Sequence, residues 1–351
     1  MAASPGALCC STTERTLAYL AYFNAYLTES RFLKPFAFIF PGQGSQSVGM
    51  LDAWSEHPLV AQTLAEASEA LGQDLGQLIR EGPKEALALT TNTQPVMLVA
   101  AVAAYRVWLA ETGAVPAAVA GHSLGEYSAL VAAGVLTLAQ ATPLVRFRAQ
   151  AMQDAVPVGV GAMAAILGMP ADKVIDGCAE AVRSFGPGST EVVEAVNFND
   201  PGQTVIAGSK AAVDKACEVL KANGAKRALP LSVSAPFHSS LMKPAADKLR
   251  EKLATLSLAA PQIPVVNNID VAVESDLDRL RDALFRQAFG PVRWVECVLA
   301  MKARGLHTLI ECGPGKVLAG MVKRIDADMT GAALFDPASL AEVKTLLMSK
   351  A

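Results

Sequence analysis

Short apolar runs alternate with longer helical patterns along most of the chain. The run from Phe36 to Phe40 is continuously apolar and ends at Pro41-Gly42, which predicts a buried strand. Apolar residues recur at helical spacing over residues 59–79 and again over 138–153, so each stretch predicts a helix. Strands that alternate with helices of this length are typical of an α/β fold built on a parallel sheet.

The same alternation continues outside the middle of the chain. Thr93-Gln94-Pro95 predicts the start of a helix, because proline suits the first helical turn. A short apolar segment at residues 115–120 predicts a strand after that helix. Towards the C-terminus we expect strands at 264–268 and 308–311, helices at 277–288 and 292–304, and a final helix after Gly315.

The middle of the chain has a different order of elements. It predicts a strand, a helix, two strands joined by the turn Asn199-Asp200-Pro201-Gly202, a second helix and a last strand, which is the ferredoxin-like order. We therefore expect residues 160–231 to form a small inserted subdomain, and residues 36–159 and 232–351 to form the main domain. The predicted elements are 161–167, 171–181, 192–196, 204–207, 210–223 and 227–233.

Residues 1–35 stand outside this alternation. The stretch from Thr16 to Leu27 is apolar and aromatic, but Asn24 interrupts it. No Lys or Arg precedes Arg15, so a secretory signal would lack its basic start, and Glu14 disfavours a mitochondrial presequence. We expect a mobile or loosely docked extension.

Composition narrows the functional classes. A chain of 351 residues with 52% hydrophobic content can bury a large core, and a net charge of −3 argues against nucleic acid as the main partner. The six cysteines are scattered without a C-x-x-C pair, so we expect no metal site and a reducing, cytoplasmic setting. We also expect no membrane partner, because no apolar run was found to approach the ~18–20 residues that a span needs.

The stretch from Gly121 to Tyr127, Gly-His-Ser-Leu-Gly-Glu-Tyr, lies between a predicted strand and a predicted helix. This order places Ser123 on a sharp turn with its hydroxyl exposed, as in a nucleophile elbow. Unpaired N–H groups at the helix N-terminus would favour negative charge on an acyl oxygen. The alternative is an ordinary turn flanked by glycines.

A serine nucleophile needs a base, and histidine is the usual one. Of the four histidines, His57 lies in a polar segment, His307 opens a strand, and His122 adjoins the serine at a tight turn. His238 lies in a loop at a strand end, where active-site residues of open α/β sheets gather, so it is the best candidate. The alternative for His238 is a capped core histidine.

Two further features concern substrate binding. Arg146 and Arg148 lie on a largely apolar helix, so one of them is a candidate to point inward, although such arginines are usually solvated. The loop after the first strand has glycines on both sides of Gln43, which could hold its backbone N–H towards a reacting atom. The alternative for that loop is a plain strand-to-helix turn.

Eight motifs follow one another in chain order from about Phe36 to the C-terminus. They are Phe-Pro-Gly-Gln-Gly-Ser-Gln (40–46), Thr-Gln-Pro (93–95), Gly-His-Ser-Leu-Gly-Glu (121–126), Arg148 with Met152-Gln153, Ser-Ala-Pro-Phe-His (234–238), Asn-Asn (267–268), Pro-Val-Arg-Trp (291–294) and Glu-Cys-Gly-Pro-Gly-Lys-Val-Leu (311–318). This set resembles the motifs of malonyl-CoA:acyl-carrier-protein transacylases. The resemblance implies an α/β-hydrolase-like domain with a ferredoxin-like subdomain, and malonyl transfer by a ping-pong route through an acyl-serine.

The resemblance implies roles in the acyl-transfer chemistry. Ser123 would carry the acyl group, and His238 would be its general base and the general acid toward the leaving thiol. The main-chain carbonyl of Gln287 would orient His238, which accounts for the absence of an obvious triad aspartate. The backbone N–H groups of Gln43 and Leu124 would form the oxyanion hole.

The resemblance also implies how the substrate is bound. Arg148 would pair with the free carboxylate of the malonyl group through two parallel hydrogen bonds. Gln94 would belong to the same substrate-binding set, and Phe237 would form a bulky wall beside the base that favours malonyl over methylmalonyl.

The implied partners are malonyl-CoA as substrate and acyl carrier protein as acceptor, with no bound cofactor and a monomeric enzyme. Two other functions are weighed against this one. A serine esterase or thioesterase would have no use for a buried arginine. A non-catalytic module that binds carrier protein would not need Ser123 and His238 together.

Overall fold

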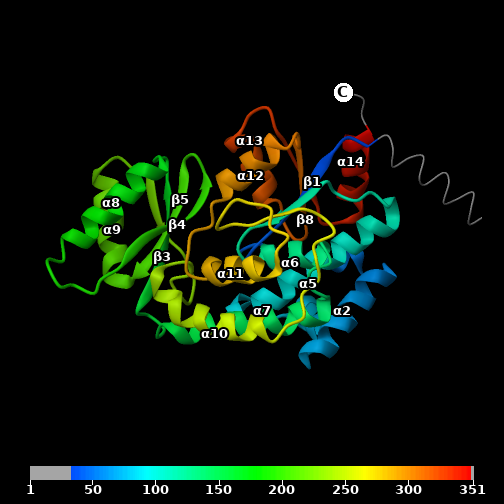
Figure 1. Cartoon of the computed structure of the whole chain (residues 1–351), viewed down its shortest axis with the longest axis horizontal. Helices are drawn as coiled ribbons and strands as arrows, with labels where there is room; N and C mark the ends of the chain where they lie inside the picture. The colour runs from blue at the N-terminus through cyan, green and yellow to red at the C-terminus, as the bar shows by residue number, and fades with distance from the viewer. Residues whose placement is uncertain (1–32, 349–351) are drawn as a thin grey trace, which may run out of the picture.

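The computed structural model describes residues 33–348, so most of the predicted extension lies outside the described residues. One of its sheets is parallel, with the strand order β7-β2-β1-β8-β9. Strands β1 and β8 of this sheet are labelled in Figure 1. The α/β class with a parallel sheet predicted from the sequence is therefore confirmed. The strands are β1 (Phe36–Phe40), β2 (Ala118–Gly121), β7 (Val265–Val266), β8 (Thr308–Cys312) and β9 (Thr330–Leu334).

Both faces of this sheet are covered by helices, which explains why β1 is apolar at every position. Phe36, Phe38 and Phe40 pack into one hydrophobic cluster, whereas Ala37 and Ile39 pack into a second one on the opposite face. Successive side chains of a strand point to opposite faces, so a strand between two helical layers needs apolar residues throughout.

The two helical layers differ in size; in Figure 1, α12 and α13 lie above the sheet, and α2, α5 and α7 lie below it. The smaller layer consists of α12 (Trp294–Ala303) and α13 (Val317–Ile325). The larger layer consists of η1 (Asp52–Trp54), α2 (Pro58–Leu71), α3 (Leu75–Glu81), α4 (Lys84–Ala88), α5 (Thr90–Thr112), α6 (Gly125–Ala132), α7 (Leu138–Ala155), η2 (Ser240–Met242), α10 (Lys243–Ala254), α11 (Leu277–Gln287) and α14 (Pro337–Met348).

Several expected boundaries were wrong. The single helix predicted at 59–79 is two helices, because Gly72 adopts a left-handed conformation and Asp74 caps α3 by accepting from the N–H of Gln77. The helix expected to begin at Thr93 begins at Thr90, with Pro95 inside it. The structure also adds β9 and α14 after α13, where only a final helix was predicted.

Helix α5 also contradicts the expectation that no segment is suited to cross a membrane. Among the described residues, it alone is long and apolar enough to do so. In the structure, 83% of its apolar 18-residue stretch is buried inside the protein, as in the core helix of a folded domain.

A separate antiparallel sheet has the strand order β4-β5-β3-β6, and it lies to the left in Figure 1. Its chain order, β-α-β-β-α-β, is ferredoxin-like, and α8 and α9 cover one of its faces. We propose residues 160–231 as the limits of this subdomain. The elements are β3 (Gly161–Leu167), α8 (Ala171–Arg183), β4 (Val193–Asp200), β5 (Gln203–Ser209), α9 (Lys210–Ala222) and β6 (Arg227–Pro230).

Strand β4 connects the small sheet to the segment that precedes α12. The N–H of Phe198 donates to the carbonyl of Val292, and the N–H of Val292 donates to the carbonyl of Val196. At the end of β4, the buried Asp200 accepts from Arg324 Nε of α13 at 2.9 Å. The position of the small sheet is therefore fixed by main-chain hydrogen bonds as well as by an ion pair.

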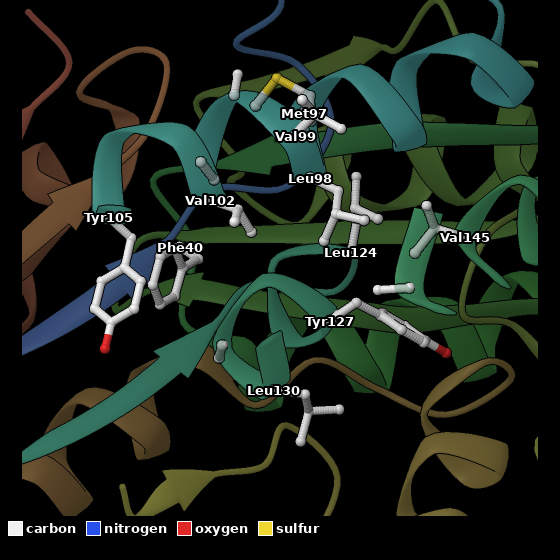
Figure 2. Close-up of a cluster of buried hydrophobic side chains, with 14 of the residues drawn as sticks. Phe40, Met97, Leu98, Val99, Val102, Tyr105, Leu124, Tyr127, Leu130 and Val145 are labelled. Atoms are coloured by element: carbon white, nitrogen blue, oxygen red, sulfur yellow. The ribbon is translucent and has the colours of Figure 1, made fainter. Parts of the chain in front are cut away.

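The hydrophobic core also supports the turn between β2 and α6. Figure 2 shows Leu124 of this region beside Leu98 of α5, with Val145 of α7 nearby; Tyr127 and Leu130 belong to the same buried cluster. Gly125 also allows the start of α6 to approach β1 closely, because a Cβ on Gly125 would lie 2.1 Å from the carbonyl oxygen of Phe40. Strand β1 and helix α6 thus pack at a distance that only glycine permits.

This contact gives a stability prediction. Replacing Gly125 by Ala should destabilise the protein by more than about 3 kcal/mol, because the clash is with backbone that cannot move aside. Gly320→Ala is the matched control, since its Cβ would meet only the Arg324 side chain at 3.8 Å, and it should be neutral or stabilise by up to about 1 kcal/mol. Urea unfolding of both variants measures this; equal stabilities would contradict the proposed packing constraint.

Candidate active site

The turn between β2 and α6 holds Ser123 in a strained conformation. Its φ is 51°, in the left-handed region, although it is not glycine. The Ser123 N–H donates to Asn268 Oδ1 at 2.8 Å, and Asn268 Nδ2 donates to the carbonyl of Gly121 at 2.8 Å. Asn268 thus fixes both sides of the turn, and this arrangement has the form of a nucleophile elbow.

His238 lies beside the serine, as the sequence predicted. Its Nε2 is 2.6 Å from Ser123 Oγ, and its Nδ1 is 2.9 Å from the main-chain carbonyl oxygen of Gln287. A carbonyl can only accept, so Nδ1 carries the proton and Nε2 is free to accept one from the serine. His238 is itself strained, with φ 68°.

The protonation of His238 is set by its surroundings. Burial, and then the positive charge of Arg148, lower the pKa of His238 to about 3. The imidazole is therefore neutral at physiological pH. It is in the form that a general base requires.

Arg148 is buried, with 2% of its surface exposed, and its guanidinium faces the serine. Nη2 is 3.2 Å from Ser123 Oγ, and Nη1 donates to Gln94 Oε1 at 2.8 Å. The guanidinium carbon lies 5.4 Å from the centre of the Tyr127 ring. Nε has no hydrogen-bond partner within residues 33–348, so the guanidinium keeps donor capacity for a ligand.

Arg146, the other candidate, points elsewhere. Its Nη2 donates to Gln73 Oε1 at 2.5 Å and to Asn92 Oδ1 at 3.1 Å. Of the two arginines that the sequence left open, only Arg148 reaches the serine.

A cavity of about 130 Å³ opens over Ser123. Gln43 and Leu124 line it together with Arg148, Gln94, Phe237 and His238, so all these predicted residues share one site. In the part of the chain that the structure describes, neither the Gln43 nor the Leu124 N–H donates to a protein group. Both are therefore available to an acyl oxygen.

A chain of hydrogen bonds connects Arg148 to the loop of Gln43, and sequence reasoning missed its middle member. Gln94 Nε2 donates to Thr90 Oγ1 at 3.3 Å, and Thr90 Oγ1 donates to Gln43 Oε1 at 2.9 Å. Thr90 precedes the Thr-Gln-Pro motif by three residues, which is one helical turn. That spacing is the signal that could have found it.

His122 does not act on its neighbour Ser123. Its Nε2 is 2.8 Å from Asn199 Oδ1, at the end of β4, and burial lowers its pKa. His122 therefore connects the elbow to the small sheet. No signal in the sequence pairs these two residues, because they are 77 positions apart.

Two buried carboxylates were also missed as features of the site region. Glu126 of α6 is 2% exposed, and Glu311 of β8 is fully buried. Burial raises the pKa of each to about 7. Within residues 33–348 no group of three or more His, Cys, Asp or Glu side chains could hold a metal ion.

Comparisons with known proteins agree with this geometry. A sequence model of the acyl transferase domain matches residues 37–335. The malonyl CoA-acyl carrier protein transacylase of Escherichia coli K12 is 54% identical over 307 residues, covering 87% of this chain and 97% of the relative. That of Bacillus subtilis is 44% identical over 308 residues, covering 87% and 94%.

Solved structures give the same result. The acyl-carrier-protein S-malonyltransferase of Burkholderia pseudomallei is 64% identical with a TM-score of 0.86, covering 89% of this chain and 100% of that one. A malonyl-transacylase solved in complex with a type II polyketide-synthase acyl carrier protein is 49% identical with a TM-score of 0.86, covering 89% and 100%. The chain therefore belongs to the acyl transferase domain family and, within it, to the malonyl CoA-acyl carrier protein transacylases.

Proposed function

We propose that this enzyme transfers the malonyl group of malonyl-CoA to the phosphopantetheine thiol of an acyl carrier protein, through a malonyl ester of Ser123. The observation that carries the proposal is a buried guanidinium 3.2 Å from the nucleophilic oxygen. A cation at that place suits an acyl group that ends in a carboxylate. The enzyme would thereby supply extender units for fatty-acid synthesis.

In the first half-reaction, Ser123 Oγ attacks the thioester carbonyl of malonyl-CoA while His238 Nε2 takes the hydroxyl proton. Negative charge develops on the carbonyl oxygen, where the Gln43 and Leu124 N–H groups would stabilise it. The C–S bond then breaks, and the thiolate of coenzyme A takes the proton from His238. The ester of Ser123 retains the malonyl group.

The second half-reaction reverses these steps with a different thiol. His238 Nε2 takes the proton of the carrier-protein thiol, and the sulfur attacks the Ser123 ester. Ser123 Oγ leaves and recovers the proton from His238. The chemistry needs no bound cofactor, because the substrates supply every bond that forms or breaks.

Arg148 would select the acyl group. A malonyl carboxylate gives the buried guanidinium an ionic partner, whereas an acetyl group leaves it with neutral partners only. Phe237, which lines the same cavity, would limit bulk beside the base. A serine esterase on this scaffold is the alternative, and it would hydrolyse the ester rather than retain it.

We also propose that the enzyme acts as a monomer in the cytoplasm. Its carrier-protein partner would be acidic, whereas the chain is net acidic, with a formal charge of −3. Docking therefore requires a local basic surface. Lys316 is exposed at the start of α13, close to the loop of Gln43, since Gly315 lies against Ser45, and Lys323 is exposed further along the same helix.

The first test concerns Ser123 and His238. Ser123→Ala should form no malonyl-enzyme adduct, and His238→Ala should slow adduct formation by ~10²–10⁴, the range for a positioned acid–base group. Mass spectrometry after mixing with malonyl-CoA measures both. Labelling of Ser123→Ala at the wild-type level would refute the assignment, and release of free malonate without any adduct would favour the esterase.

The second test concerns selectivity. Arg148→Ala should lower kcat/KM for malonyl-CoA steeply, because the carboxylate would be buried without a counter-charge. The kcat/KM for acetyl-CoA should fall little, so the ratio of the malonyl-CoA to the acetyl-CoA value should fall by ~10³, which is about 4 kcal/mol. Equal losses for both substrates would mean that Arg148 is structural.

The third test concerns carrier-protein docking. Replacing Lys316 and Lys323 by Glu should raise KM for carrier protein, more so at low salt, and should change KM for malonyl-CoA less. Arg324 is unsuitable for this test, since it pairs with Asp200 at the end of β4. Lys173→Glu, on the outer helix α8, is the control. Unchanged carrier-protein kinetics at low ionic strength would refute the surface.

A further inference from the structure

The charge of Arg148 has no direct ionic partner. Within residues 33–348, the groups that contact its guanidinium are Gln94, Ser123, Gln287 and the Tyr127 ring, all uncharged. A cation buried to this degree needs a counter-charge, because transfer from water costs several kcal/mol even after relaxation. Hydrogen bonds from neutral groups alone rarely compensate for this cost.

One carboxylate is placed to supply the missing charge. Glu126 follows Ser123 by three residues, in the first turn of α6, and is 2% exposed. Its Oε2 accepts from the N–H of Asn268 at 2.9 Å and from Gln287 Nε2 at 3.2 Å. The positive end of the α6 dipole also favours a negative charge at this position.

The side-chain amide of Gln287 lies between the two charged groups. Its Oε1 accepts from Arg148 Nη2 at 3.2 Å, and its Nε2 donates to Glu126 Oε2 at 3.2 Å. The negative end of the amide thus faces the cation and its positive end faces the carboxylate. This orientation connects Arg148 to Glu126 through one polarised group.

We propose that Glu126 is the resident counter-charge of Arg148, and that it takes up a proton when the carboxylate of the acyl group binds the guanidinium. The proposal rests on the malonyl specificity proposed above. In the empty site the buried charges balance, one positive and one negative. A bound malonyl carboxylate adds a second negative charge, and protonation of Glu126 restores the balance.

The other titratable groups around Glu126 do not provide the counter-charge of Arg148. Tyr127 is neutral, since burial raises its pKa to about 12, and burial also raises the pKa of the Cys297 thiol. Asp270 is ionised, but Arg286 binds it through two hydrogen bonds of 2.7 and 2.8 Å. Among the described residues packed around Glu126, Arg148 is therefore the one charged group without an ionic partner of its own.

The direction of the pH dependence follows from these charges. Burial raises the pKa of Glu126 to about 7 in the empty site, and a second carboxylate near it raises the pKa further. At a pH between the pKa of Glu126 in the empty site and its higher pKa beside the malonyl carboxylate, malonyl binding is accompanied by uptake of a proton. Affinity for malonyl-CoA should be highest below about pH 7 and fall by up to about tenfold per pH unit above it, whereas affinity for acetyl-CoA should not.

The experiment uses Ser123→Ala, which cannot form the ester, titrated with malonyl-CoA and acetyl-CoA by calorimetry in two buffers of different ionisation enthalpy. Near pH 7.5 we expect roughly 0.5–0.8 proton taken up per malonyl-CoA and none with acetyl-CoA. Adding Glu126→Gln should abolish the uptake. The single variant already tests the proposal if the double variant fails to fold.

Each remaining outcome has a defined meaning. Adding Glu311→Gln is the matched control, because Glu311 is equally buried but its Oε2 accepts from the N–H of Ala319 in α13, so uptake should persist. Uptake that persists with Glu126→Gln would assign the proton to another group, such as His238, and overturn the proposal. Malonyl preference without uptake would overturn it and leave the proposed function intact, whereas no preference for malonyl-CoA would refute the role of Arg148 itself.

Discussion

A buried guanidinium beside the nucleophile is the constraint on which the rest of the site depends. Together with burial, which has the larger effect, the charge of Arg148 lowers the pKa of His238 and keeps the imidazole neutral and able to accept the serine proton. The charge of Arg148 also explains why a main-chain carbonyl, rather than a carboxylate, orients His238. An aspartate at that place would bring a second negative charge close to the cation and compete with the acyl carboxylate, whereas the Gln287 carbonyl fixes the tautomer without any charge.

The catalytic geometry is held by the packing of the whole fold rather than by the turn itself. Ser123 and His238 both have positive φ, which costs of order 1–3 kcal/mol each and persists only where the surroundings impose it. For Ser123 these surroundings are Asn268, at the end of β7, and the contact of Gly125 with β1. The carboxyl ends of the central strands therefore lie close to the serine, as expected for a site in an open parallel sheet.

The sequence predicted the parts of the fold that have strong local signals. The strand at Phe36–Phe40 and the one at Gly161–Leu167 have the predicted bounds, and the elbow lies where its glycines indicated. Strand β9 was missed because Gly331 and its alanine neighbours have little strand propensity; the strand forms through pairing with β8, and Gly331 permits close contact with α13. Thr90 and Glu126 were missed because their roles depend on partners brought near by folding.

The small sheet has a part in the site that its sequence did not indicate. Asn199 of β4 binds His122, which adjoins the nucleophile, and the next residue, Asp200, binds Arg324 of α13. Phe237, which also lines the cavity, packs against the face of the small sheet that lacks helices. The cavity over Ser123 is lined by Met163 and Asn197 of the small sheet, and β4 is hydrogen-bonded through Val196 and Phe198 to Val292, just before α12. The main-chain hydrogen bonds that hold β4 against Val292 therefore also place Asn197, which lies between the two bonded residues, at the cavity.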